Sequence, residues 1–77
     1  MIFLIEYDRE RGQIVTFRSF PDSEREGSEN ARLEMEIGLN RRGIEHEVVL
    51  LEATSEQALR LTHRRYFEDL SELVKAS

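Results

Sequence analysis

The alternation of apolar and polar residues predicts two β-strands within the first twenty residues. Residues 2–5 are a continuous apolar run, which is typical of a strand buried on both faces of a sheet. The polar stretch that follows ends at Gly12, a residue that tolerates the positive φ of a tight turn. Residues 13–20 are then rich in β-branched and aromatic side chains. The pattern predicts a hairpin with strands at 1–8 and 13–20.

The next segment, residues 23–40, is predicted to form a helix. Pro21 cannot continue a β-ladder, and Ser23 with Glu26 has the spacing of a capping box. Five residues between positions 31 and 36 favour helix by propensity, namely Ala31, Leu33, Glu34, Met35 and Glu36. Gly43 suits the position just after a helix C-terminus.

The apolar positions of this segment leave a second interpretation open. In a helix, one side carries Ala31, Met35 and Leu39, while Leu33 and Ile37 lie nearly opposite. Such a helix needs apolar neighbours on two sides. Positions 33, 35, 37 and 39 also alternate with polar or small residues, which is the period of a strand. The alternative is therefore a fourth strand at 31–39, paired in a hairpin with the strand that follows.

A third strand and a second helix complete the predicted elements. Residues 44–53 are expected to form the strand, and its second half is apolar on both faces. Thr54 and Gln57 have capping-box spacing and predict the start of the helix. We expect that helix to reach residue 75, which corresponds to about 30 Å at the standard rise per residue.

These elements predict one α+β domain over residues 1–77. Because strand 1–8 is the most apolar, we place it at the centre of a three-stranded antiparallel sheet of order 2-1-3. The arrangement is then ββαβα, with both helices on one face of the sheet. The alternative is a four-stranded meander followed by the C-terminal helix. The element order resembles part of a ferredoxin-like sandwich, a kind of fold that hosts many unrelated functions.

Composition and charge narrow the class of protein. The 77 residues include no cysteine, so a disulfide framework and a thiolate metal site are both excluded. The apolar start of the chain is interrupted at Glu6 and is too short for a signal peptide or a membrane span. We therefore expect a cytoplasmic protein without membrane association. The formal net charge of −5 opposes non-specific binding to nucleic acid.

The two histidines are the only candidates for catalysis or metal binding. His46 stands between Glu45 and Glu47, but neighbours on a strand point to opposite faces, so the three side chains are not expected to converge. His63 lies on the apolar stripe of the last helix, and two histidines alone make a poor metal site. No established catalytic motif is present. We expect no catalytic residue, no cofactor, no metal and no catalytic activity.

Arginines suggest one alternative function. The last helix and the end of the first helix carry basic residues beside an aromatic ring, a combination that binds phosphate or a nucleic-acid backbone. Each of these arginines has an acidic residue at helical spacing or lies near a helix end, which favours a solvated, self-paired surface. The candidate residues for weak phosphate or nucleic-acid binding are Arg41, Arg42, Arg60, Arg64, Arg65 and Tyr66.

The preferred hypothesis is a small protein-interaction module. The first helix has two apolar sides, the sheet has apolar residues on both faces, and the last helix is expected to extend beyond the core. Apolar residues left on a surface mark contact sites, and symmetric dimers are the commonest assembly. We therefore predict a homodimer, or else an unidentified protein partner. The candidate interaction residues are Val49, Leu51, Leu70, Leu73 and Val74.

Overall fold

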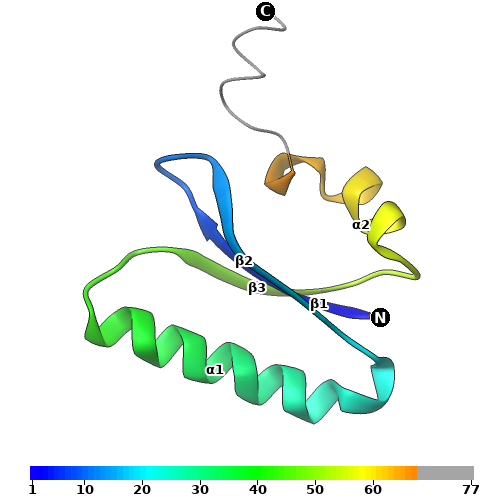
Figure 1. Ribbon diagram of the computed structural model, residues 1–77, viewed down its shortest axis with the longest axis horizontal. Helices are drawn as coiled ribbons and strands as arrows, with labels where there is room; N and C mark the ends of the chain where they lie inside the picture. The colour runs from blue at the N-terminus through cyan, green and yellow to red at the C-terminus, as the bar shows by residue number, and fades with distance from the viewer. Residues whose placement is uncertain (68–77) are drawn as a thin grey trace, which may run out of the picture.

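A three-stranded antiparallel sheet forms the centre of the protein (Figure 1). The computed structural model describes residues 1–67. Strand β1 (Ile2–Asp8) pairs with β2 (Gln13–Phe20) on one side and with β3 (Glu47–Glu52) on the other. The strand order β2-β1-β3 and the antiparallel directions confirm the predicted sheet. The hairpin turn uses Gly12 at a φ of 65°, where a residue without Cβ carries little strain.

The segment with two possible interpretations is a helix. Helix α1 (Arg25–Arg41) follows a short 3₁₀ turn at Asp22–Glu24. The fourth strand at 31–39, and with it the four-stranded meander, is therefore excluded. Gly43 ends the helix at a φ of 67°, and the Ile44 N–H donates to the Leu39 carbonyl at 2.9 Å. Because this closing turn occupies residues 43–46, β3 begins three residues later than predicted.

The two helices cover opposite faces of the sheet, so the prediction that both lie on one face is wrong (Figure 1). On one face, Ile2 and Leu4 pack with Ala31 and Met35 of α1. On the other face, Phe3, Ile5 and Tyr7 pack with Leu59 of α2 (Glu56–Thr62) and with Tyr66. The physical reason lies in β1, whose successive side chains alternate between faces and are nearly all apolar. Each face of such a strand needs its own cover.

The last helix is much shorter than predicted. Helix α2 ends at Thr62, because His63 has a φ of −124° and a ψ of 52°, and a 3₁₀ turn follows at Arg64–Tyr66. The turn carries Tyr66 into the core, where its ring meets the Tyr7 ring edge-on at 5.1 Å between centroids. The predicted helical residues 68–75 lie outside the described residues. The helix cap is also displaced by one residue: the Ser55 hydroxyl, rather than Thr54, accepts from the Ala58 N–H.

The two outer strands differ in regularity. Between β1 and β2 the register shifts near Glu6 and Tyr7, which pair with Thr16 and Ile14, and Val15 is the extra residue of a β-bulge. Between β1 and β3, six consecutive residue pairs run from Ile2–Glu52 to Tyr7–Glu47 without a shift. A bulge twists a strand and disrupts its outer edge, whereas a regular strand leaves its edge suited to further pairing.

Replacement of Leu59 by alanine tests how α2 is held. Leu59 is fully buried against β1, so Leu59→Ala should lower the free energy of unfolding by about 2–5 kcal/mol. Leu61 lies on the same helix and is 71% exposed, so the matched variant Leu61→Ala should change that free energy by less than about 0.5 kcal/mol. Denaturant unfolding measures both, and equal effects would contradict the placement of α2.

Candidate functional site

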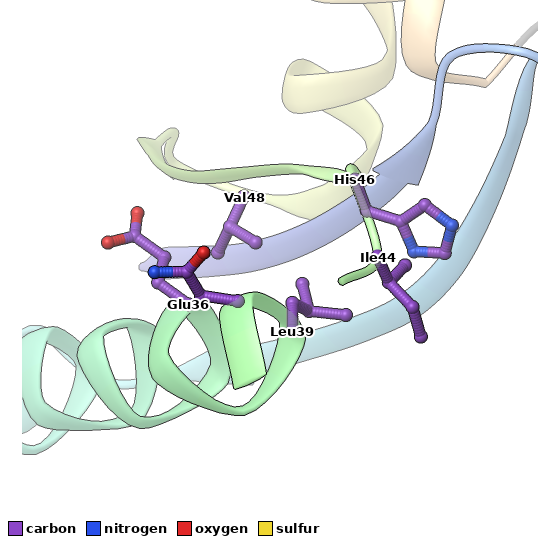
Figure 2. Close-up of a pocket in the computed structure, with 6 residues that line it drawn as sticks. Glu36, Leu39, Ile44, His46 and Val48 are labelled. Atoms are coloured by element: carbon purple, nitrogen blue, oxygen red, sulfur yellow. The ribbon is translucent and has the colours of Figure 1, made fainter. Parts of the chain in front are cut away.

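Surface hollows converge on His46, at the point where the chain leaves α1 and enters β3. One hollow of about 330 Å³ separates the C-terminal half of α1 from the start of β3, and Figure 2 shows the His46 ring at one end and Glu36 at the other. A second, of about 460 Å³, opens beside the β1–β2 turn, and a third, of about 360 Å³, lies between Arg9 and Glu47. His46 lines all three.

The His46 ring is held by two carboxylates of β1. Its Nδ1 lies 2.6 Å from Glu6 Oε2, and its Nε2 lies 3.6 Å from Asp8 Oδ2. The other Glu6 oxygen accepts from the Thr16 hydroxyl at 2.8 Å. The side chains of His46 and Glu6 are only 19% and 10% exposed. The buried Glu6 carboxylate is therefore satisfied by two partners, which is what a buried charge requires.

This arrangement ties the closing turn of α1 to the sheet. Glu6 and Asp8 come from the α1 face of β1, and both His46 nitrogens face carboxylates rather than one common point. In residues 1–67 no three histidine or acidic side chains are grouped so that they could hold a metal ion. His63 follows α2 on the opposite face of the sheet. The structure thus does not bring the two histidines together.

A second polar cluster fixes the turn after α2 to the start of β3. Tyr66 donates its hydroxyl to Glu47 Oε1 at 3.2 Å, and Arg65 contacts Glu47 at 3.0 Å. The Arg65 guanidinium also lies over the Tyr66 ring, 4.3 Å from its centroid, a favourable cation–π position. Arg9 approaches the same Glu47 oxygen at 3.6 Å. Glu47 thus receives contacts from three residues of two other segments.

Burial and charge shift two pKa values in this cluster. Burial and the negative charge of Glu47 raise the pKa of Tyr66 above its ordinary value. Partial burial opposes ionisation of Glu47, but the charges of Arg65 and Arg9 and the hydrogen bonds from Tyr66 and Arg65 together lower the pKa of Glu47. Near neutral pH the cluster therefore contains a carboxylate, a guanidinium and a neutral phenol.

The candidate anion-binding residues do not form one surface. Arg41 and Arg42 are exposed at the C-terminal end of α1, on one face of the sheet. Arg60, Arg64, Arg65 and Tyr66 belong to α2 and the turn after it, on the other face. Arg60 pairs with Glu56 at 3.4 Å and lies 4.6 Å from the Phe67 ring centroid. The sheet separates the two groups.

The candidate interaction residues divide between the core and the part of the chain beyond residue 67. Val49 and Leu51 are partly buried against the cluster that α2 covers. Leu70, Leu73 and Val74 lie outside the described residues. Leu33 and Ile37 are not among the predicted interaction residues, yet they are 52% and 43% exposed on the outer side of α1. Their position opposite Met35 was already visible in the helical period.

The contacts of His46 were also missed at the sequence level. Its partners Glu6 and Asp8 lie about forty positions away in the chain. One signal was present: two acidic residues at alternate positions directly after an apolar run, on the same face of one strand. The pattern did not reveal the register of β3 against β1, and this register determines that His46 is the side chain that contacts Glu6 and Asp8.

Comparison with protein-family models, with curated proteins and with solved structures found no match for this chain. Any functional conclusion therefore rests on the residues themselves. No helix within residues 1–67 combines the length and the apolar character that crossing a membrane requires.

Removal of His46 tests whether it compensates a buried charge. His46→Ala leaves Glu6 without one of its two partners, so the free energy of unfolding at pH 7 should fall by about 1–3 kcal/mol. Glu45 is the exposed neighbour, and Glu45→Ala should change it by less than about 0.5 kcal/mol. Denaturant unfolding provides both values. A His46→Ala variant as stable as Glu45→Ala would show that the contact contributes nothing.

The lowered pKa of Glu47 predicts a pH-dependent contribution to stability. A carboxyl whose pKa is lower in the folded state stabilises the fold above its ordinary value of 4.5, and this contribution disappears as the pH falls through the lowered value. Glu47→Gln should therefore reduce the free energy of unfolding at pH 7 by about 1 kcal/mol. The difference from the wild type should shrink in acid.

The control for this experiment is Glu45→Gln, measured by denaturant unfolding between pH 7 and acid pH. Glu45 is an exposed residue two positions away, and its loss of charge should have little effect at any pH. A Glu47→Gln effect that is the same at every pH would contradict the assignment, because it would come from shape rather than charge.

Proposed function

We propose that this protein is a small interaction module that associates with itself and has no catalytic activity of its own. The observation that supports it most directly is the outer edge of β3, which is regular, apolar over residues 48–51 and not covered by any described segment. A three-stranded sheet with such an edge offers a ready template for another strand.

The shape of the molecule leaves both edges of the sheet open. Along its shortest axis the Cα trace extends only 12 Å, and Figure 1 is viewed along that axis, with the sheet seen edge-on between the two helices. Three strands alone occupy about 10 Å at the usual spacing. The helices therefore lie above and below the sheet and do not extend past its edges.

Of the two edges, that of β3 is better suited to association. The β2 edge carries the Val15 bulge and the exposed Arg18, and bulges and charges are the devices that protect an edge from pairing. Residues 48–51 of β3 are Val-Val-Leu-Leu, without a bulge, a proline or a charge. Such an edge on an isolated chain is an association site.

The outer side of α1 is a second apolar surface. Leu33 and Ile37 lie one helical turn apart and are largely exposed. Helix α2 could have covered them if both helices lay on one face of the sheet, but it lies on the other face. This surface also supports self-association, although two side chains form a smaller apolar patch than a strand edge with its backbone groups.

The anion-binding alternative receives less support from the geometry. Its residues lie on two faces of the sheet, and Arg60 and Arg65 already contact Glu56 and Glu47. Because no continuous basic surface joins them, self-association is the function that the arrangement favours.

The mass of the protein in solution tests the proposal. Sedimentation equilibrium or light scattering across micromolar concentrations should give a mass that rises from the 9.1 kDa of one chain towards twice that value. Dilution should reverse the change, because the association is non-covalent in a chain without cysteine. A mass of one chain at every concentration would exclude self-association under these conditions.

A further inference from the structure

The hydrogen bonds of Met1 with Ala53 define which peptide groups of β3 face outwards. The Met1 amine donates to the Ala53 carbonyl at 3.0 Å, and the Ala53 N–H donates to the Met1 carbonyl at 3.2 Å. In an antiparallel ladder, such doubly bonded pairs alternate with pairs that share no hydrogen bond. Given the register of β1 and β3, the N–H and C=O groups of Val48, Leu50 and Glu52 point away from β1.

These outward groups have no partner in the described part of the chain. Within residues 1–67 the ladder with β1 uses the other peptide groups of β3, and no turn or side-chain hydrogen bond reaches those of Val48, Leu50 or Glu52. The Arg25 ion pair involves the side-chain carboxylate of Glu52, not its peptide group. Three donors and three acceptors therefore form a row along the open edge. The row is symmetric about Leu50, with one residue on either side.

We infer that the occupant of this edge is a second copy of the chain, related by a two-fold axis through Leu50, so that two three-stranded sheets join into one of six strands. This inference rests on the proposed self-association and adds its surface and register. With Leu50 opposite Leu50 of the partner, Val48 of each copy lies opposite Glu52 of the other. The Leu50–Leu50 pair and the two Val48–Glu52 pairs are then all doubly hydrogen-bonded. The outward N–H and C=O groups of Val48, Leu50 and Glu52 then have hydrogen-bond partners in both copies.

The side chains fit the same register. On the α2 face, Val49 of one copy lies opposite Leu51 of the other, which pairs two apolar residues directly. On the α1 face, Leu50 meets Leu50, and Glu52 faces Val48 rather than another acid. A shift by two residues, with Val49 opposite Val49, would leave Glu52 beyond the paired residues of the partner strand. In the register centred on Leu50, all of residues 48–52 of one copy pair with residues 48–52 of the other.

Helix α1 adds a self-complementary row of charges beside this edge. Arg25, Glu29, Arg32 and Glu36 have the spacing of one helical stripe and alternate in sign. Arg25 pairs with Glu52, and Glu36 lines the hollow that Val48 also lines, so the stripe follows β3. Within one helix Arg32 pairs with Glu36 at 3.1 Å. In an antiparallel pair of α1 helices, Arg25 faces Glu36 of the partner and Glu29 faces Arg32, so the existing pairs extend into a network of alternating charges.

Helix α1 also lies close to this edge, because it packs on β3 and on β1. The two-fold axis lies outside β3 by about half of the usual strand spacing, which is about 2.4 Å. Pairing of the two β3 edges therefore places the two copies of α1 side by side on the same face of the joined sheet.

Amide hydrogen exchange, followed by NMR at increasing protein concentration, tests the inference without any substitution. The amides of Val48, Leu50 and Glu52 should exchange rapidly in the monomer and become protected as the dimer forms. Phe17 and Ser19 have outward N–H groups on the β2 edge by the same alternation. They serve as internal controls and should stay unprotected at every concentration.

Cysteine variants test the register, because the natural chain has no cysteine. Mixing Val49→Cys chains with Leu51→Cys chains should give a disulfide-linked dimer, since directly opposite residues without hydrogen bonds have Cα atoms about 4.5 Å apart. Either variant alone should form far less of the linked dimer. Two copies of the same residue are displaced by two positions along the paired strands, so their Cα atoms lie about 8 Å apart, beyond the reach of a disulfide.

The outcomes separate the inference from the proposed function. Protection at Val48, Leu50 and Glu52 together with cross-linking only in the mixture supports both. A doubled mass with unchanged exchange at these amides would support self-association but overturn the β3 interface. If the Leu33→Glu variant then no longer formed the dimer, the interface would be assigned to α1 instead. Cross-linking of Val49→Cys alone would overturn the register. A mass of one chain at every concentration would remove the proposed function itself.

Discussion

The burial of β1 on both faces is the constraint on which the rest of the fold depends. Residues 2–5 are essentially inaccessible to solvent, and their side chains alternate between the two faces of the sheet. One helix cannot cover both, so α1 and α2 occupy opposite faces (Figure 1). With both helices used in this way, no described element remains to cover the edges of the sheet. The open edge of β3 follows from the same constraint that builds the core.

The polar contacts at the start of β3 depend on this layering. His46 reaches Glu6 on the α1 face of the sheet, while Glu47, the next residue, reaches Arg65 and Tyr66 on the α2 face. His46 thus ties the closing turn of α1 to β1, and Glu47 ties the turn after α2 to the start of β3. They hold both covering layers in place without occupying the outward peptide groups of β3.

Much of the fold could be predicted from the sequence, because local patterns determine local structure. The hairpin, the central position of β1 and the strand order followed from the apolar run at residues 2–5 and the turn at Gly12. The capping-box spacing of Ser23 and Glu26 and the helix propensities of residues 31–36 predicted α1, although the alternation at positions 33–39 left a strand open. The end of α2 at Thr62 was not predictable, since it depends on Tyr66 turning back to pack on Tyr7.

The candidate sites were less predictable than the fold, because they depend on contacts between distant segments. The sequence could suggest that Leu33 and Ile37 need a neighbour, but not that α2 lies on the other face. It could place Val49 and Leu51 on one face of a strand, but the outward row of peptide groups required the register with β1. The contacts of His46 with Glu6, and of Glu47 with Arg65, required the same three-dimensional information.

The most direct measurement of the central claim is an isotope-filtered NMR experiment on a mixture of labelled and unlabelled chains, which detects only contacts between copies. Pairing of two β3 edges about Leu50 predicts a strong contact between the Hα of Val49 in one copy and the Hα of Leu51 in the other, because these residues face each other at the closer spacing of a sheet. Intermolecular contacts confined to the side chains of Leu33 and Ile37 would contradict the account, because the copies would then meet through α1.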